Sequence, residues 1–337
     1  MKNEDYLWDR SGEPDRDVAR LEESLSSLRH CPSPPQFPEA EFEKLRRRRA
    51  SFWRFSSPRL ALAAAVAVLM AVVGYREISS QRAPANAWAV TRLEGSPRLD
   101  SGALRRNARI AEGQSLVTDS ASRARIDVAD IGEVELGPNS RLRVVQTRPG
   151  RKELALDRGF LHARISAPPR QFYVNTPSAM AVDLGCEYDL SVDDSGAGLI
   201  RVTMGWVQFE SGVHKVLIPA GALARTRPGL GPGTPFFAEV SAEFQSALEV
   251  LDFASDDPAA RRSALRLVLE QARRDDSLSM FYLLFRVSDS ERALVYDWLA
   301  KTLPPPSGVT REAVLRLDQS QIDAWMDAWG LDHPARD

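Results

Sequence analysis

Residues suited to bind a metal or to act as a nucleophile are few in this 337-residue chain. Cysteine occurs at Cys31, directly after His30, and at Cys186. A structural zinc ion needs four ligands, commonly including a close pair of cysteines, but residues 1–57 hold no further histidine or cysteine. The sequence therefore predicts no metal site. Cys186 has no histidine or cysteine near it in sequence, which favours a small buried side chain over a reactive or ligating thiol.

Candidate catalytic residues are equally sparse. His162 and His214 lie in segments with strand-like patterns, where we interpret them as surface or hydrogen-bonded residues rather than bases. Asp193 and Asp194 belong to VDDSGAGL, which indicates a turn, because Asp accepts local backbone hydrogen bonds and Gly permits positive φ. No G-x-S-x-G, H-E-x-x-H, P-loop or dinucleotide-binding pattern occurs. We predict neither enzymatic activity nor a cofactor.

The element expected to position the rest of the chain is an uncharged apolar run from Leu60 to Tyr75. As a helix it would be about 24 Å long, apolar on every face, with aromatic residues at both ends as at the two interfaces of a bilayer. A buried helix is one alternative. A cleaved signal peptide is another, but such signals begin within the first 15–30 residues. We predict an uncleaved transmembrane helix at residues 58–76, with anchor residues Leu60, Leu62, Val66, Leu69, Val73 and Tyr75.

A block of arginines on one side of this run predicts its orientation. Arg46, Arg47, Arg48 and Arg49 precede the run, whereas few Lys or Arg residues follow it directly. Because an excess of Lys and Arg marks the cytoplasmic side, the N-terminus is predicted inside and the C-terminus outside. Such a block can also bind nucleic acid. Its position beside an apolar run and the overall formal charge of −2 favour the topological role, with no nucleic-acid partner.

Residues 1–57 are predicted to form a cytosolic segment with a single amphipathic helix at residues 15–29. Apolar residues recur there at helical spacings of three and four. One helix of this length cannot form a core of its own. Its apolar stripe must therefore meet the nearby aromatic residues, the lipid bilayer or another protein. The stripe, our candidate surface for a protein partner, consists of Val18, Leu21, Leu25 and Leu28.

Beyond the predicted membrane segment, the spacing of the apolar residues changes along the chain and indicates two different domains. After a linker at residues 77–87, short runs of period two alternate with turn patterns such as GPNS and RPGR. They predict an all-β domain at residues 88–235, either a β-sandwich or a short β-solenoid. The period then becomes helical and predicts a small all-α domain of four or five helices at residues 236–337. Thr310 is the expected N-cap of one of these helices.

The β segment resembles the FecR domain, named for the iron-dicitrate regulator of the bacterial cell envelope. Seven short elements match in order over roughly residues 88–225, among them GQSLVT, ELGPNSRLRV and VNTP. The family's Gly-Thr-x-Phe element reads GCEY here, with Cys186 for Thr and Tyr188 for Phe. The motif positions are Gly113, Gly159, Thr176, Gly185, Tyr188, Gly205, Val207 and Gly221.

This resemblance implies a single-pass protein of the bacterial inner membrane, with its N-terminus in the cytoplasm and its C-terminus in the periplasm. It implies that the protein senses a signal or a partner on the periplasmic side and relays it to a cytosolic regulator, such as a sigma factor. The alternative function is a cell-envelope module that binds a protein or a glycan and has no signalling output.

Overall fold

The structure of this protein is a computed structural model, in which contacts divide the chain into two units, Met1–Ser79 and Ser80–Asp337. The described residues are 16–26, 86–100, 102–212, 214–254 and 257–331.

In the first unit, the structure describes one helix, α2 (Arg16–Leu25), which lies within the predicted helix at residues 15–29. The predicted anchor at residues 58–76 and the arginine block before it lie outside the described residues. Within the ranges that the structure does describe, no helix is long and apolar enough to cross a membrane.

The second unit begins with a network of 18 strands. All described strand pairs are antiparallel except β9 with β10, which makes the β region mixed. The strands are β1 (Trp88–Glu94), β2 (Arg98–Leu99), β3 (Gly102–Ala103), β4 (Asn107–Ile110), β5 (Ser115–Val117), β6 (Arg123–Asp127), β7 (Gly132–Leu136), β8 (Arg141–Arg148), β9 (Arg151–Ile165), β10 (Phe172–Asn175), β11 (Met180–Asp183), β12 (Glu187–Val192), β13 (Gly198–Met204), β14 (Trp206–Ser211), β15 (His214–Pro219), β16 (Ala222–Arg227), β17 (Gly231–Pro232) and β18 (Phe236–Phe237).

These strands form two sheets that share β9. The first sheet has the order β4-β1-β6-β7-β9-β12-β13-β16, and both β17 and β18 pair with β16. The second sheet has the order β3-β2-β5-β8-β9-β10-β11-β14-β15. The first half of β9, up to Arg158, pairs in the second sheet, and the remainder, from Gly159, pairs in the first.

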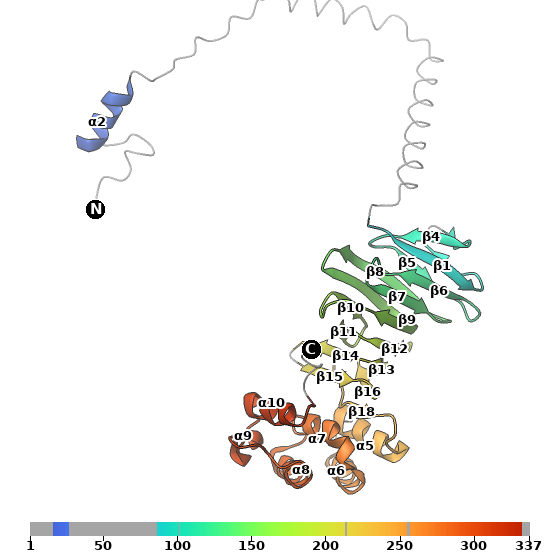
Figure 1. Ribbon diagram of the computed structural model, residues 1–337, viewed down its shortest axis with the longest axis vertical. Helices are drawn as coiled ribbons and strands as arrows, with labels where there is room; N and C mark the ends of the chain where they lie inside the picture. Colours follow the sequence, from blue (N-terminus) through green and yellow to red (C-terminus); the bar gives the residue numbers. More distant parts are fainter. Residues whose placement is uncertain (1–15, 27–85, 101, 213, 255–256, 332–337) are drawn as a thin grey trace, which may run out of the picture. The chain divides into compact units, whose positions relative to one another are not determined.

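The chain alternates between the two sheets as it advances, so that β1 and β4 lie at one end of the β region and β15, β16 and β18 at the other, next to the helices (Figure 1). The predicted β region followed by helices is therefore present. Of the two architectures that the sequence left open, the structure combines the two sheets of a sandwich with the end-to-end advance of a solenoid.

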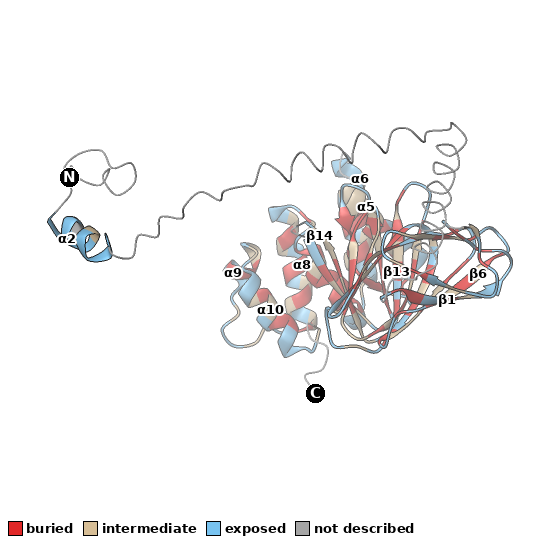
Figure 2. Cartoon of the chain, turned by 90° about the horizontal axis from the view of Figure 1, so that it is seen from above, coloured by how far each residue is buried: buried red, intermediate tan, exposed pale blue. Residues whose placement is uncertain are grey.

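Alternation along each strand places every second side chain in the core. Leu142 and Val144 of β8 are fully buried, as are Leu154 and Leu156 of β9, and all belong to one hydrophobic cluster. The period-two pattern of these runs is thus confirmed. Figure 2 shows buried residues inside the β region and along the helices. Each such aliphatic side chain contributes about 1.5–3 kcal/mol by its burial.

Six α-helices and one 3₁₀-helix follow in the described part of the chain, rather than the four or five helices expected. The prediction that Thr310 is an N-cap is confirmed, because its Oγ1 accepts a hydrogen bond from the Ala313 N–H at 3.3 Å. The extra helices are short ones that a periodicity argument does not separate. The helices are α5 (Ala242–Phe253), α6 (Pro258–Gln271), η3 (Arg274–Asp276), α7 (Ser277–Leu283), α8 (Asp289–Thr302), α9 (Arg311–Leu315) and α10 (Gln319–Ala328).

Hydrogen bonds join these helices to the end of the β region. The side chain of Asp252 in α5 is only 3% exposed and accepts hydrogen bonds from the N–H and the hydroxyl of Thr234, each at 2.8 Å. Arg286 Nε lies 3.7 Å from the same carboxylate. Ser279 of α7 donates to the carbonyl of Pro235 at 2.7 Å. The boundary expected at residue 235 therefore falls inside one compact unit, since β18 still pairs with β16 beyond it.

Candidate functional site

The apolar face of α2 is the first candidate site. The side chains of Leu21 and Leu25 are 61% and 53% exposed. Leu28 and the side chain of Val18, the other two residues of the predicted stripe, lie outside the described residues. Two large apolar side chains this exposed on one short helix provide surface that a partner can bury.

The glycines of the FecR-like motif serve the fold. Gly113 and Gly221 stand in turns with φ of +83° and +85°. Gly205 and Gly185 belong to a close approach of two backbones, because a Cβ at Gly205 would lie 2.1 Å from the Gly185 carbonyl oxygen. Glycine is required there by space as well as by conformation.

Gly159 lies in the middle of β9, where the strand passes from one sheet to the other. The sequence indicated a strand beginning at this glycine, but the strand starts eight residues earlier, at Arg151. Gly159 has a φ of +100°, and a Cβ there would lie 2.4 Å from the Cα of Ser140. Ser140 Oγ accepts the Phe160 N–H at 2.9 Å directly beside it. This glycine therefore permits the bend that joins the two sheets.

The other motif residues are also structural. Thr176 closes the hairpin between β10 and β11, since its Oγ1 accepts the Ala179 N–H at 3.0 Å. Tyr188 of β12 and Val207 of β14 are fully buried, one in each sheet. None of the eight motif positions brings reactive groups together in the described structure.

Cys186 and Asp183 form a buried polar pair beside this motif. The Cys186 thiol donates to Asp183 Oδ2 at 2.5 Å, and Asp183 Oδ1 accepts the Gly185 N–H at 2.7 Å. Burial raises the pKa of Asp183 to about 6. Burial, together with the negative charge of Asp183, raises the pKa of the Cys186 thiol well above its usual range. Because the thiolate is the reactive form, Cys186 is a packed residue, in agreement with the sequence prediction.

Within the described ranges, no group of three His, Cys, Asp or Glu residues lies close enough together to hold a metal ion. His30 and Cys31 lie outside those ranges. His162 lies on the surface of the first sheet, with Nδ1 2.8 Å from Asp189 Oδ1. His214 is at the start of β15, beside a groove.

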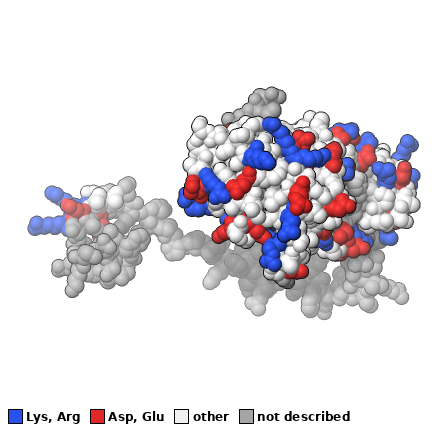
Figure 3. Space-filling model, turned by 90° about the horizontal axis from the view of Figure 1, so that it is seen from below, with Lys and Arg blue, Asp and Glu red and all other residues white. Residues whose placement is uncertain are grey.

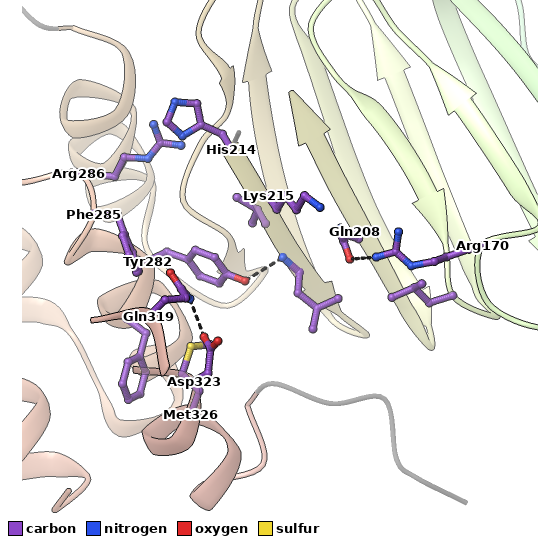
Figure 4. A pocket seen from close by; sticks show the side chains of 14 residues that line it. Arg170, Gln208, His214, Lys215, Tyr282, Phe285, Arg286, Gln319, Asp323 and Met326 are labelled. Carbon is purple, nitrogen blue, oxygen red and sulfur yellow. Dashed lines mark hydrogen bonds between the residues drawn. The ribbon is translucent and has the colours of Figure 1, made fainter. Parts of the chain in front are cut away.

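This helix–sheet groove is a cavity of about 750 Å³ between the second sheet and helices α7 and α10. Figure 4 shows residues from the strands on one side and residues from the helices on the other. The sheet side comprises Arg170, Leu184, Gln208, His214, Lys215, Val216 and Leu217. The helix side comprises Phe281, Tyr282, Phe285, Arg286, Gln319, Asp323 and Met326.

The two sides of the groove differ in charge. Arg170 and Lys215 on the sheet side are 52% and 58% exposed, and both approach the same carboxylate, Glu210, at 3.7 and 3.8 Å. On the helix side, Asp323 accepts a hydrogen bond from Gln319 at 2.6 Å. Elsewhere on the helix-bearing face in Figure 3, positive and negative side chains are interspersed, without a large area of one sign.

Sequence reasoning missed this groove. It interpreted the segment DSLSMFYLLFRVSDSERALVYDWL as helical core, and Phe281 and Leu283 are indeed fully buried. Tyr282 and Phe285 of the same segment line the groove instead. Their partners on the sheet side come from more than 60 residues earlier in the chain, so no local pattern reveals them.

The described structure thus defines a two-sheet β domain with an appended helical region, whose sequence motif is structural and whose open site suits binding. Residues 114–208 match the family model described as FecR protein, so this part of the chain is a FecR domain. The match lies inside the segment, roughly residues 88–225, that carried the sequence resemblance.

Solved structures show a more distant likeness. Two crystal structures of a "putative anti-sigma factor" from Parabacteroides distasonis, at 2.50 and 1.65 Å resolution, each share 13% identity with this chain at a TM-score of 0.33. The matches cover 40% of this chain and 62% or 63% of those chains. The chain therefore spans about three fifths of the length of the structures it matches. No curated protein matches the chain.

Proposed function

We propose that this protein is a membrane-anchored, non-enzymatic regulator of the FecR type. In this proposal, residues 58–76 cross the bacterial inner membrane and residues 1–57 lie in the cytoplasm. The β domain and the helical region then lie in the periplasm, where they bind a partner. The helix at residues 15–29 binds a cytosolic regulator, for which a sigma factor is the proposed partner.

The exposed face of α2 is the observation that carries this proposal. Leu21 and Leu25 are more than half exposed on a helix of ten residues, and an isolated helix of that length is marginal in water. Binding into an apolar groove of a partner would bury both leucines and stabilise the helix. The FecR domain at residues 114–208 supports a regulatory role. The apolar run from Leu60 to Tyr75 supports the membrane anchor.

Alanine at both Leu21 and Leu25 is expected to abolish recovery of the cytosolic partner. Each substitution removes apolar surface worth on the order of 1–2 kcal/mol when buried, so the pair should weaken binding by at least about tenfold. The measurement is an affinity pull-down with the tagged full-length chain, in which the recovered sigma factor is quantified. Arg20→Ala with Glu23→Ala, on the opposite face of the helix, is the matched control. Equal recovery with both double variants would contradict the proposal.

A second function, an envelope module without signalling output, is favoured by one observation. The helix–sheet groove is formed entirely by residues of the second unit, so a partner could occupy it without any role for residues 1–57. The two functions make opposite predictions for a chain that lacks the cytosolic segment.

A further inference from the structure

We propose that the helix–sheet groove binds a peptide segment of an envelope protein in which acidic and large apolar side chains alternate. This inference rests on the proposed function, because it names the surface at which the periplasmic partner would bind and the chemistry of that partner. Its evidence, however, is the geometry of the groove alone.

The size and apolar lining of the groove suit a few residues of a bound chain. A cavity of about 750 Å³ is within the range of about 300–1,000 Å³ typical of binding pockets. Phe281 is fully buried beneath it, and Phe285, at its edge, remains 39% exposed. An aromatic side chain that is partly open beside apolar neighbours is typical of the residues that contribute most to binding energy. The partner is therefore expected to insert an apolar side chain next to Phe285.

The charge of the sheet side selects an acidic neighbour for that apolar side chain. Arg170 and Lys215 share the single carboxylate of Glu210, at 3.7 and 3.8 Å, so one positive charge of the three-residue cluster is not neutralised. Arg170 also donates to Gln208 at 3.0 Å, which holds its guanidinium along the groove (Figure 4). A carboxylate placed between Arg170 and Lys215 would complete this cluster with charge-assisted hydrogen bonds.

The helix side disfavours a simple anion such as a phosphate or a lipid headgroup. Asp323 lies on that side and would repel a ligand that is negative throughout. Arg286 lines the same side, but its side chain is only 17% exposed and lies 3.7 Å from the carboxylate of Asp252, which compensates its charge. A peptide avoids this repulsion because its neutral backbone amides can face Asp323 and Gln319 while its carboxylate faces the sheet. A phosphate also has no apolar group that could contact the apolar residues of the groove.

Side chains, rather than a new strand, are expected to hold the peptide. Among the strands that the structure describes, β15 pairs in the second sheet only with β14, and an edge strand of this kind can accept an added strand. Here the N–H of Leu217 already donates to the hydroxyl of Tyr282 at 2.8 Å. Helix α7 therefore covers the edge of β15 at that point, and the binding energy must come from the groove itself.

The test measures binding of defined peptides to the purified full-length chain by fluorescence anisotropy. The probe is an acetylated, amidated nine-residue peptide that alternates Glu with Leu and Phe. Its two controls replace Glu by Lys, or Leu and Phe by Ser. We expect the Glu-Leu-Phe peptide to bind with an affinity that falls as salt is raised, and each control to bind at least about tenfold more weakly.

Variants of the chain locate the binding. Arg170→Gln with Lys215→Gln, and separately Phe285→Ala, should each weaken binding by at least about tenfold. Arg143→Gln, an exposed arginine of β8, is the matched control and should leave the affinity unchanged. Because Arg170 and Lys215 are both more than half exposed, their substitution is expected to leave the fold intact, which protease resistance would verify.

Several results would overturn the inference. Equal binding of the Lys peptide would exclude charge selection, and equal binding of the Ser peptide would reduce the site to a general anion site. A membrane surface would be the ligand if vesicles of anionic phospholipid displaced the probe from the unaltered chain and bound the groove variants more weakly. Failure of the peptide with normal recovery of the cytosolic partner would refute the groove and leave the relay standing. Binding of the peptide without recovery of the cytosolic partner would refute the relay alone.

Discussion

Gly159→Ala is expected to destabilise the Ser80–Asp337 unit by at least about 4 kcal/mol. The residue has a φ of +100°, which costs any residue with a Cβ about 1–2 kcal/mol. The added Cβ would also lie 2.1 Å from Ser140 Oγ and 2.4 Å from Ser140 Cα. The backbone contact cannot be relieved by rotation of a side chain, so β9 must shift where it joins the two sheets. Pulse proteolysis of the full-length chain in urea measures the loss.

Gly113→Ala is the matched control for this prediction. Gly113 also has positive φ, at +83°, but a Cβ there would meet nothing within 4 Å. The conformational cost of about 1–2 kcal/mol should then be the whole effect. Similar losses for the two variants would show that the bend in β9 tolerates a side chain, and the structural role given to Gly159 would be wrong.

The second large effect is a pH dependence that arises from Asp183. Burial raises the pKa of this carboxyl from an ordinary value of 3.8 to about 6 in the folded protein. The folded state therefore binds the proton more tightly than the unfolded state, and its stability must fall as the pH rises through this range. The difference between the two pKa values corresponds to about 3 kcal/mol. This contribution is fully present below pH 4 and is lost by about pH 7.

The measurement compares the free energy of unfolding of the wild type and Asp183→Asn from pH 4 to pH 7. The wild type should lose about 3 kcal/mol relative to the variant over this interval. Asp193→Asn is the matched control, because hydrogen bonds from Ser195 and from the backbone lower the pKa of Asp193 below its ordinary value of 3.8. Stability due to Asp193 is therefore present throughout the interval from pH 4 to pH 7 and is lost only at lower pH, so this variant should run parallel to the wild type. Parallel curves for the wild type and Asp183→Asn would contradict the burial of this charge.

Local patterns predicted much of this fold because alternation and capping act over a few residues. The buried series Leu142, Val144, Leu154 and Leu156 follows directly from period two. The cap at Thr310 follows from the chemistry of one hydroxyl. The FecR-like motif was recognisable for the same reason, since its glycines mark turns and close contacts whose backbone requirements can be inferred from residue type.

The features that escaped prediction depend on contacts between distant parts of the chain. A glycine inside a run usually indicates a break, so Gly159 suggested the start of a strand rather than a bend within one of 15 residues. The parallel pairing of β9 with β10 requires a crossover through the other sheet, which periodicity does not encode. The groove joins Arg170, Lys215 and Asp323, and only the packing of α10 beside β15 brings these residues together.

Deletion of residues 1–43 tests most directly the central claim, that binding in the periplasm is relayed to a cytosolic regulator. Transcript profiles would be compared between cells that produce the full chain and cells that produce equal amounts of the shortened chain. Our account predicts that the shortened chain still binds the groove peptide but no longer changes transcription. Identical transcript changes and cell phenotype with both chains would contradict the relay and favour an envelope module without signalling output.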